Sequence, residues 1–479
     1  MHELVGMYVD GTWRPAKSGA TTALVNPATG EEFGRLSLAS AADIEDALAA
    51  AQRGFARWRQ IPSAERCRLI SLAGQLLRER VDAIGRDLTL EQGKTLTQAK
   101  GEILATADYF TGIAAAATNL FGRVPPTGSD GIRRSVTYEP IGPVFAVSPW
   151  NLPAMMPGRK IANSLGAGCS VIVKPARETP LSAYAIAKCC EDAGIPPGVV
   201  NVICGDAAQI SAAMIASPVI RKVSFTGSTP VGRALAQEAG TSLKRITLEL
   251  GGHAPVIVFD DVDLEEVVEA TVMARFANAG QSCLAPTRFF VQERRYAQFA
   301  ELFSARAGAL RVGEGMDPAT QMGPLTSARR LPLMDALVSD ARQKGARLTS
   351  GGKRLERPGF FFAPTVLADV PKHAALMSEE PFGPVTAIVP FDDVPEVVER
   401  ANATAYGLAA YVFTRDADLA MRVVAQIEAG MVGINSMSVA HPSLPFGGVK
   451  DSGIGREGAY DGLLDSMVTK SISIGRQGA

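Results

Sequence analysis

The chain has 479 residues, of which 47% are hydrophobic and 20% are charged, and its formal net charge at pH 7 is −1. A chain of this length exceeds what one compact core normally holds, so we expect two or more domains. A net charge this close to zero leaves no strong field of either sign, which argues against nucleic acid as a partner.

The N-terminus and the cysteines favour a protein of a reducing compartment. Glu3 and Asp10 flank a short apolar stretch, without the basic start and apolar run of a secretory signal. The six cysteines, which form no CxxC pair and no Cys/His cluster at metal-ligand spacing, are Cys67, Cys169, Cys189, Cys190, Cys204 and Cys283. We therefore expect reduced thiols, a cytoplasmic location and no metal site.

One uncharged segment, 140–158, is long enough to be compared with a membrane span. Its five prolines would interrupt a lipid-exposed helix repeatedly. A buried strand followed by a loop is the better prediction, and we expect no membrane partner.

The expected elements change character along the chain. From Ala42 to about Gly122 the apolar spacing is mostly helical, with Ile44 and Leu48 on one face. From Tyr138 onward, short apolar strands alternate with helices, a pattern typical of a parallel sheet. The expected strands of this series are 144–147, 171–173, 199–203, 221–225 and 246–250, and its helices begin near Pro180, Gly205 and Pro230. This part is predicted to be a doubly wound α/β domain.

A second α/β series follows the double glycine at 251–252, where we place the first domain boundary. Its expected elements are a strand at 256–259, a helix at 264–279, a strand at 288–292, a helix at 296–310 and a further helix between 311 and 359. The tail from 466 to 474 alternates in the manner of an edge strand.

Cys283 ends the loop Phe276-Ala-Asn-Ala-Gly-Gln-Ser-Cys283, just past an expected helix end. Small neighbours leave a thiol accessible, although a buried structural cysteine is the commoner fate of this residue type. A cysteine hydrolase needs a histidine to form the thiolate and to protonate the leaving group, and the four histidines lie in no Cys/His signature. If Cys283 is a nucleophile, attack on an aldehyde with hydride as the departing species fits.

Glu249 lies between Leu248 and Leu250 at the end of an expected buried strand. Ligands bind at strand ends in doubly wound sheets, and partial burial raises the pKa of a carboxyl toward the range of a general base. The alternative is a residue that points outward from an edge strand.

Three further segments offer groups for ligand binding. Segment 224–232 follows the order strand, glycine turn and helix start, where backbone N–H groups can bind a phosphate; it does not match GxGxxG, and a structural turn is an equal alternative. Lys174, one step past an expected strand, could reach a ribose or phosphate, and its alternative is a solvated lysine. Asn151, between Pro149 and Pro153, could donate to an oxyanion, and its alternative is a turn asparagine.

In this order and spacing, the segments resemble the aldehyde dehydrogenase superfamily over essentially the whole chain. The motifs that carry the resemblance are PWNLP at 149–153, KPA at 174–176, FTGSTPVG at 225–232, LELGGHAP at 248–255, FANAGQSC at 276–283, EEPFGPV at 379–385 and PFGGVKDSGIGREG at 445–458. They look most like those of bacterial succinate-semialdehyde and 2-oxoglutarate-semialdehyde dehydrogenases. The resemblance implies an α/β fold with two doubly wound Rossmann-type domains and a small β oligomerisation arm.

The resemblance also implies roles for motif residues. Cys283 would be the nucleophile, Glu249 the general base, and Asn151 with the Cys283 backbone N–H the oxyanion hole. The residues expected to bind the cofactor are Trp150, Lys174, Arg177, Gly227, Ser228, Gly232, Glu380 and Phe382. The reaction would be the NAD(P)-dependent oxidation of an aldehyde or semialdehyde to the acid, through a cysteine thiohemiacetal and a thioester.

Domain boundaries follow from the same resemblance. We expect a cofactor-binding domain in 1–117 and 141–251, a catalytic domain in 252–449, and an arm in 118–140 and 462–479. The arm would join copies of the chain into a dimer or a tetramer.

Two departures bear on substrate and cofactor. Succinate-semialdehyde enzymes typically hold the substrate carboxylate with two arginines; Arg159 matches one, but Ala277 stands at the other position. Arg177 stands where NAD-preferring relatives often carry a glutamate, so we expect NADP to be accepted alongside NAD. Two other classes stay open: a cysteine thioester hydrolase or acyltransferase without redox chemistry, and a catalytically silent binding homologue.

Overall fold

The computed structural model of the protein describes residues 2–126, 128 and 131–475. Its strands are β1 (His2–Val5), β2 (Met7–Val9), β3 (Thr12–Arg14), β4 (Thr21–Val25), β5 (Glu32–Ser37), β6 (Arg133–Pro140), β7 (Val144–Val147), β8 (Val171–Lys174), β9 (Val200–Val202), β10 (Lys222–Thr226), β11 (Arg245–Glu249), β12 (Ala254–Val258), β13 (Pro286–Gln292), β14 (Arg347–Ser350), β15 (Thr365–Ala368), β16 (Val385–Phe391), β17 (Tyr406–Gly407), β18 (Ala409–Phe413), β19 (Met431–Ile434), β20 (Val449–Lys450), β21 (Gly453–Ile454) and β22 (Met467–Ile474).

Its helices are α1 (Ala41–Trp58), α2 (Ser63–Glu79), α3 (Val81–Gln92), α4 (Leu96–Ala117), α5 (Met155–Gly166), α6 (Leu181–Asp192), α7 (Ala207–Ala216), α8 (Thr229–Thr241), α9 (Leu264–Phe276), α10 (Glu293–Gly308), α11 (Arg330–Gln343), α12 (Val394–Asn402), α13 (Ala417–Val424) and α14 (Ala459–Leu464). Two short 3-10 helices cover Ala277–Gly280 and Ala375–Met377. Within the residues described, no helix is long and apolar enough to cross a membrane.

The first of two large sheets has the strand order β21-β11-β10-β7-β8-β9-β2-β3. Its central strands β11, β10, β7, β8 and β9 pair in parallel, which confirms the prediction from alternating strands and helices. The strand predicted at 144–147 is β7, and the one at 246–250 is β11 shifted by one residue. The predicted helical layer forms α1 to α4, and α4 packs on α2 and α5.

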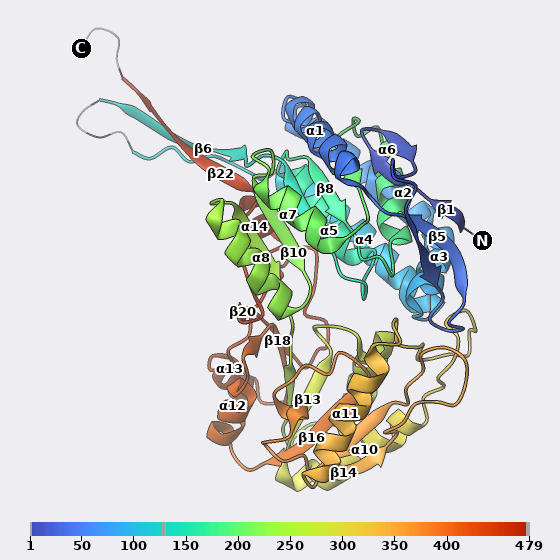
Figure 1. The fold of residues 1–479 in the computed structure, drawn as a ribbon. Helices are drawn as coiled ribbons and strands as arrows, with labels where there is room; N and C mark the ends of the chain where they lie inside the picture. The colour runs from blue at the N-terminus through green and yellow to red at the C-terminus, as the bar shows by residue number, and fades with distance from the viewer. Residues whose placement is uncertain (1, 127, 129–130, 476–479) are drawn as a thin grey trace.

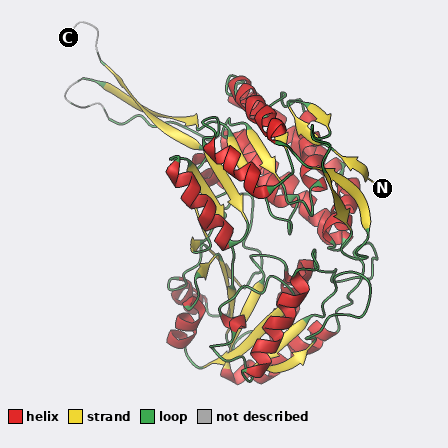
Figure 2. Ribbon diagram, in the orientation of Figure 1, coloured by secondary structure: helices red, strands yellow, loops and turns green. Residues whose placement is uncertain are grey.

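The second sheet has the strand order β14-β15-β16-β13-β12-β18-β19. Its first strand in the sequence, β12, starts at Ala254, shortly after the double glycine at 251–252. Figures 1 and 2 show it as a separate α/β unit, with helices such as α10 and α11 packed against its strands. One predicted element is too long: α9 ends at Phe276 instead of residue 279. Asn278 and Ala279 have φ values of 53° and 52°, and this left-handed conformation cannot continue a right-handed helix.

A two-stranded arm projects from the first unit (Figure 1). Its strands β6 and β22 pair antiparallel over eight residues each, from Pro140 with Met467 to Arg133 with Ile474. The strand predicted at 466–474 is thereby confirmed. Most residues of β22 are exposed, so the arm contributes little to the core of its own chain.

Candidate active site

Cys283 lies where two cavities meet. The first has a volume of about 400 Å³, and its lining includes Lys94, Glu102, Arg159, Ala277, Cys283 and Phe446. The second has a volume of about 230 Å³, and its lining includes Trp150, Asn151, Gly227, Ser228, Cys283, Arg330, Glu380 and Phe382. We refer to them as the Arg159 cavity and the Ser228 cavity. The predicted site residues that line neither cavity, although the structure describes them, are Lys174, Arg177, Gly232 and Glu249.

The loop before Cys283 places its thiol differently from the other five, which are all buried. After the left-handed turn at Asn278 and Ala279, Cys283 is partly exposed. Burial of the sulfur raises the pKa of the Cys283 thiol to about 12, and the charges of Glu380 and Glu249 act in the same direction. The thiol therefore needs a cation or a base nearby to become a thiolate.

Asn151 follows β7 in the loop between Pro149 and Pro153 and is only 4% exposed. Its Nδ2 donates to the Gln281 carbonyl at 3.0 Å, two residues before Cys283. The side-chain amide thus lies beside the nucleophile loop.

Glu249 ends β11 and is 1% exposed, so the alternative of an outward-facing residue on an edge strand is wrong. Within the described part of the chain neither carboxyl oxygen has a hydrogen-bond partner. Burial raises the pKa of the Glu249 carboxyl well above its usual range, and the charge of Glu457 adds to this. An unpaired buried carboxyl of raised pKa suits a proton acceptor that acts near neutral pH.

The Ser228 cavity opens on the start of α8. Ser228 is the N-cap residue of this helix, and within the described residues its side chain makes no capping hydrogen bond. Since Pro230 has no N–H, the N–H groups of Thr229 and Val231 are the ones that the first turn offers to a ligand. The hydroxyl of Thr226, in the same lining, is buried without a partner among the described residues. These groups fit a phosphate or ribose of a dinucleotide.

Two predicted cofactor residues, Lys174 and Gly232, are buried but do not line the Ser228 cavity. Lys174 is 5% exposed, so the alternative of a solvated lysine is wrong. Burial lowers the pKa of its ammonium group, whose Nζ donates to the Pro175 carbonyl at 3.3 Å. Gly232 packs closely on Leu250: a Cβ there would lie 2.4 Å from the end of the Leu250 side chain, which would have to shift to make room.

Glu380 and Phe382 also line the Ser228 cavity. Glu380 accepts the N–H of Gly252 at 2.9 Å, and burial raises the pKa of its carboxyl to about 7. Phe382 has a φ of 40°, and its ring lies edge-on to Trp150 with 5.3 Å between centroids. Arg330 donates to the Phe382 carbonyl at 3.1 Å and stabilises this strained turn.

Arg177 is exposed in the loop after β8. The next residue, Glu178, accepts a hydrogen bond from Arg329 at 2.6 Å. Since Arg329 precedes α11, this ion pair links the second unit to the loop after β8 in the first.

Arg159 on α5 is 4% exposed, and its guanidinium lies 3.9 Å from the centre of the Phe446 ring. Its Nε and Nη1 are buried and have no partner among the residues described. Ala277 lines the same cavity and leaves room beside it. The cavity is therefore lined by a buried cation, two of whose nitrogens have no partner in the described part of the chain.

Sequence reasoning missed a polar group in the helical layer. Lys94, Gln98 and Glu102 all line the Arg159 cavity. Gln98 and Glu102, four residues apart, lie on one face of α4, and this spacing was the available signal. Lys94 lies just before this helix, whose N-cap residue is Thr95. The sequence was interpreted there only as a helical layer, because charged residues on a helix usually face solvent.

The chain is similar to known proteins over almost its whole length. A family model described as "Aldehyde dehydrogenase family" matches residues 13–472. A putative 4-(hydroxymethyl)benzenesulfonate dehydrogenase of Comamonas testosteroni is 47% identical over 97% of this chain and 97% of its own. The succinate-semialdehyde dehydrogenase (NADP(+)) of Escherichia coli strain K12 is 40% identical over 98% of this chain and 97% of its own. The crystal structure of succinate-semialdehyde dehydrogenase from Burkholderia pseudomallei has a TM-score of 0.96 at 41% identity, over 98% of both chains. The chain therefore belongs to the aldehyde dehydrogenase family, and it oxidises an aldehyde to the carboxylic acid with NAD or NADP.

Proposed function

We propose that the substrate is an aldehyde that also carries an anionic group, a carboxylate or a sulfonate. The observation that carries this proposal is Arg159, a buried guanidinium that lines the cavity reaching Cys283 and whose nitrogens Nε and Nη1 have no partner among the described residues. A buried charge without a partner is costly, and an anion of the substrate would relieve that cost. The names of two relatives support the idea, since benzenesulfonate and succinate semialdehyde both carry an anion.

Cys283, Asn151 and Glu249 are proposed to carry out the reaction. The Cys283 thiol gives up its proton to a base, and the thiolate adds to the aldehyde carbon, while the Asn151 amide with the Cys283 N–H holds the resulting oxyanion. As the oxyanion collapses, hydride would leave that carbon for the nicotinamide that a bound cofactor supplies, and a thioester remains. Glu249 then takes a proton from water, which attacks the thioester and releases the acid. Glu249 must move to do so, because it lines neither cavity as described.

The Ser228 cavity is the proposed place for the nicotinamide end of the cofactor. Lys174, Ser228 and the first-turn N–H groups of α8 would hold its ribose and phosphates, and Glu380 and Phe382 would position the nicotinamide end. A nicotinamide ring bound there would supply the hydride acceptor and a positive charge beside the Cys283 thiol.

Acceptance of NADP is supported by the ion pair of Glu178 with Arg329. A carboxylate near the adenosine ribose repels a 2′-phosphate, but here an arginine neutralises it. Arg177, exposed beside it, offers a second positive charge. We propose that the enzyme uses both NADP and NAD.

The larger organisation is proposed on the same basis. Residues 1–117 and 141–251 would bind the cofactor, 252–449 would supply the nucleophile, and 118–140 with 462–479 would join copies into a dimer or tetramer. The exposed strands of the arm support the last assignment. The free cysteines support a cytoplasmic location, where thiols stay reduced.

A substrate panel tests the proposal. Succinate semialdehyde and 4-formylbenzenesulfonate are compared with butanal and benzaldehyde, which lack the anion, and reduced cofactor is followed. We expect kcat/KM to be higher for the anionic member of each pair. Equal values within each pair would show that no anion is recognised. Turnover of an activated ester without cofactor, and no oxidation of any aldehyde, would instead favour the hydrolase alternative.

A further inference from the structure

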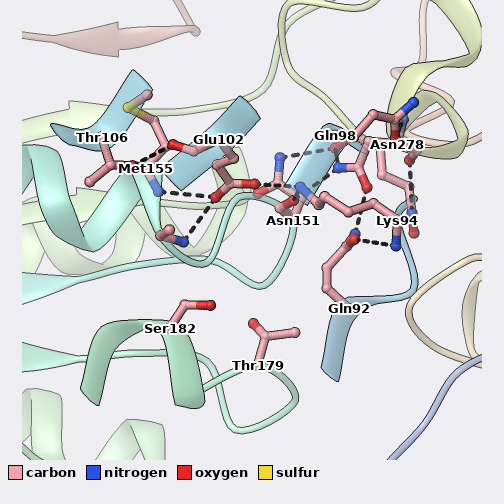
Figure 3. Close-up of polar contacts among 12 residues, drawn as sticks. Gln92, Lys94, Gln98, Glu102, Thr106, Asn151, Met155, Thr179, Ser182 and Asn278 are labelled. Atoms are coloured by element: carbon pink, nitrogen blue, oxygen red, sulfur yellow. Dashed lines mark hydrogen bonds and ion pairs between the residues drawn. The ribbon is translucent and has the colours of Figure 1, made fainter. Parts of the chain in front are cut away.

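A buried ion pair lies under the loop that carries Asn151. Lys94 Nζ and Glu102 Oε2 are 2.5 Å apart, and their side chains are 2% and 4% exposed. Figure 3 shows the pair together with Asn151 and the neighbouring polar groups. Removing two charges from water costs several kcal/mol for each, and apolar residues of similar volume often stabilise a fold equally well. The pair therefore needs an explanation beyond stability.

Both charged groups form hydrogen bonds to the backbone at Asn151 and just after it. Lys94 Nζ donates to the Asn151 carbonyl at 3.0 Å. Glu102 Oε1 accepts the N–H groups of Ala154 and Met155 at 2.9 and 3.0 Å. The loop is thus held at Asn151 by the cation and at the start of α5 by the anion, and the ion pair fixes the separation of these two points.

The same network reaches the loop that precedes Cys283. Asn278, left-handed at a φ of 53°, donates from Nδ2 to the Asn151 carbonyl at 2.9 Å. Its Oδ1 accepts from Gln92 Nε2 at 2.6 Å. The side chain of Asn151 in turn donates to the Gln281 carbonyl at 3.0 Å. The Asn151 carbonyl is therefore the junction between the two loops.

We propose that Lys94 and Glu102 are positioning residues for the oxidation step. Their charges hold the Asn151 loop against the Cys283 loop, so that the amide donor and the sulfur meet the same carbonyl group. The inference rests on the proposed roles of Asn151 and Cys283. A displacement of about 1 Å between reacting groups can lower a rate by roughly 100-fold. Loss of the Lys94 and Glu102 charges should therefore slow the hydride-transfer step.

The test is a double variant, Lys94→Met with Glu102→Gln. Glutamine keeps an acceptor for the two N–H groups at the start of α5, and the double change leaves no unpaired buried charge, so we expect the variant to fold. Single-turnover measurements with enzyme in excess over aldehyde give the rate constant of reduced-cofactor formation, and titration of the Cys283 thiol gives the number of intact sites. We expect this rate constant to fall about 10- to 100-fold per intact site, while the cofactor Kd changes less than about twofold.

The matched control is Lys222→Met with Asp465→Asn. This ion pair, 2.8 Å long with side chains 4% and 22% exposed, is also largely buried but lines neither cavity. The control should lose thermal stability and keep the wild-type rate constant per intact site.

A purely structural ion pair would lower the number of intact sites in the Lys94/Glu102 variant and leave the rate constant per site at the wild-type value. That result would overturn the inference. If the double variant does not fold, Gln92→Met removes the side-chain bonds of Gln92 to Asn278, Thr326 and the Lys94 N–H, keeps both charges of the ion pair, and must slow the same step. A wild-type rate constant there overturns the inference too. Failure of the proposed role of Cys283 is distinguishable, since in that case Cys283→Ala would itself keep the wild-type rate constant of reduced-cofactor formation.

Discussion

Replacing Arg159 by methionine isolates the recognition of the substrate anion. Methionine keeps much of the packing against Phe446 and removes Nε and Nη1, the two nitrogens without a partner among the described residues. Each hydrogen bond to a charged group is worth about 1.5–3 kcal/mol. Two such bonds at the lower limit give about 3 kcal/mol, or roughly a 100-fold loss of kcat/KM at 1.4 kcal/mol per tenfold.

The assay compares kcat/KM for 4-formylbenzenesulfonate and benzaldehyde in wild type and Arg159→Met. The loss should fall on the anionic substrate alone, because the uncharged aldehyde makes neither bond. Arg288→Met is the matched control: Arg288 is also buried, but its donors are engaged by the carbonyls of His253, Arg400 and Ala401. An equal loss for both aldehydes in Arg159→Met would refute the reasoning and make the arginine structural.

Three further outcomes are expected. Cys283→Ala should abolish aldehyde oxidation and leave cofactor binding, measured by fluorescence, nearly intact; wild-type turnover would remove Cys283 from the mechanism. Glu249→Gln should form one reduced cofactor per site and then turn over about 10²–10⁴-fold more slowly. Because the pKa of Glu249 is raised and the base acts when ionised, wild-type kcat should fall as the pH drops through that raised pKa, and this limb should vanish in the variant; an unchanged profile would identify another base. Arg177→Glu should lower the ratio of kcat/KM for NADP to that for NAD, and an unaltered ratio would show that Arg177 does not read the 2′ position.

The sequence predicted local features better than features set by distant contacts. The central strands are fixed by short apolar runs between turns, and β7 appears at the predicted residues. The helix α9 ended early because Asn278 bonds to Gln92 and Gln98, about 180 residues away in the chain, and no local pattern contains that information.

Burial of charge was the second failure of local reasoning. Nothing in the local sequence marks Lys174 or Lys94 as a buried lysine, yet both side chains are buried in the structure. What buries them is the packing of separate elements, which depends on the whole fold. Motif residues such as Cys283 could be proposed because their chemistry and their neighbours in the sequence coincide.

The ion pair between Glu178 and Arg329 has a consequence for any assay of this enzyme. Its side chains are 32% and 78% exposed, and pairs of this kind contribute less than about 1 kcal/mol. Dissolved salt weakens such a pair further, over a screening length of about 8 Å at physiological ionic strength. Arg329 therefore neutralises Glu178 less effectively as the salt concentration rises, so ionic strength has to be held constant before the apparent affinities for NADP and NAD are compared.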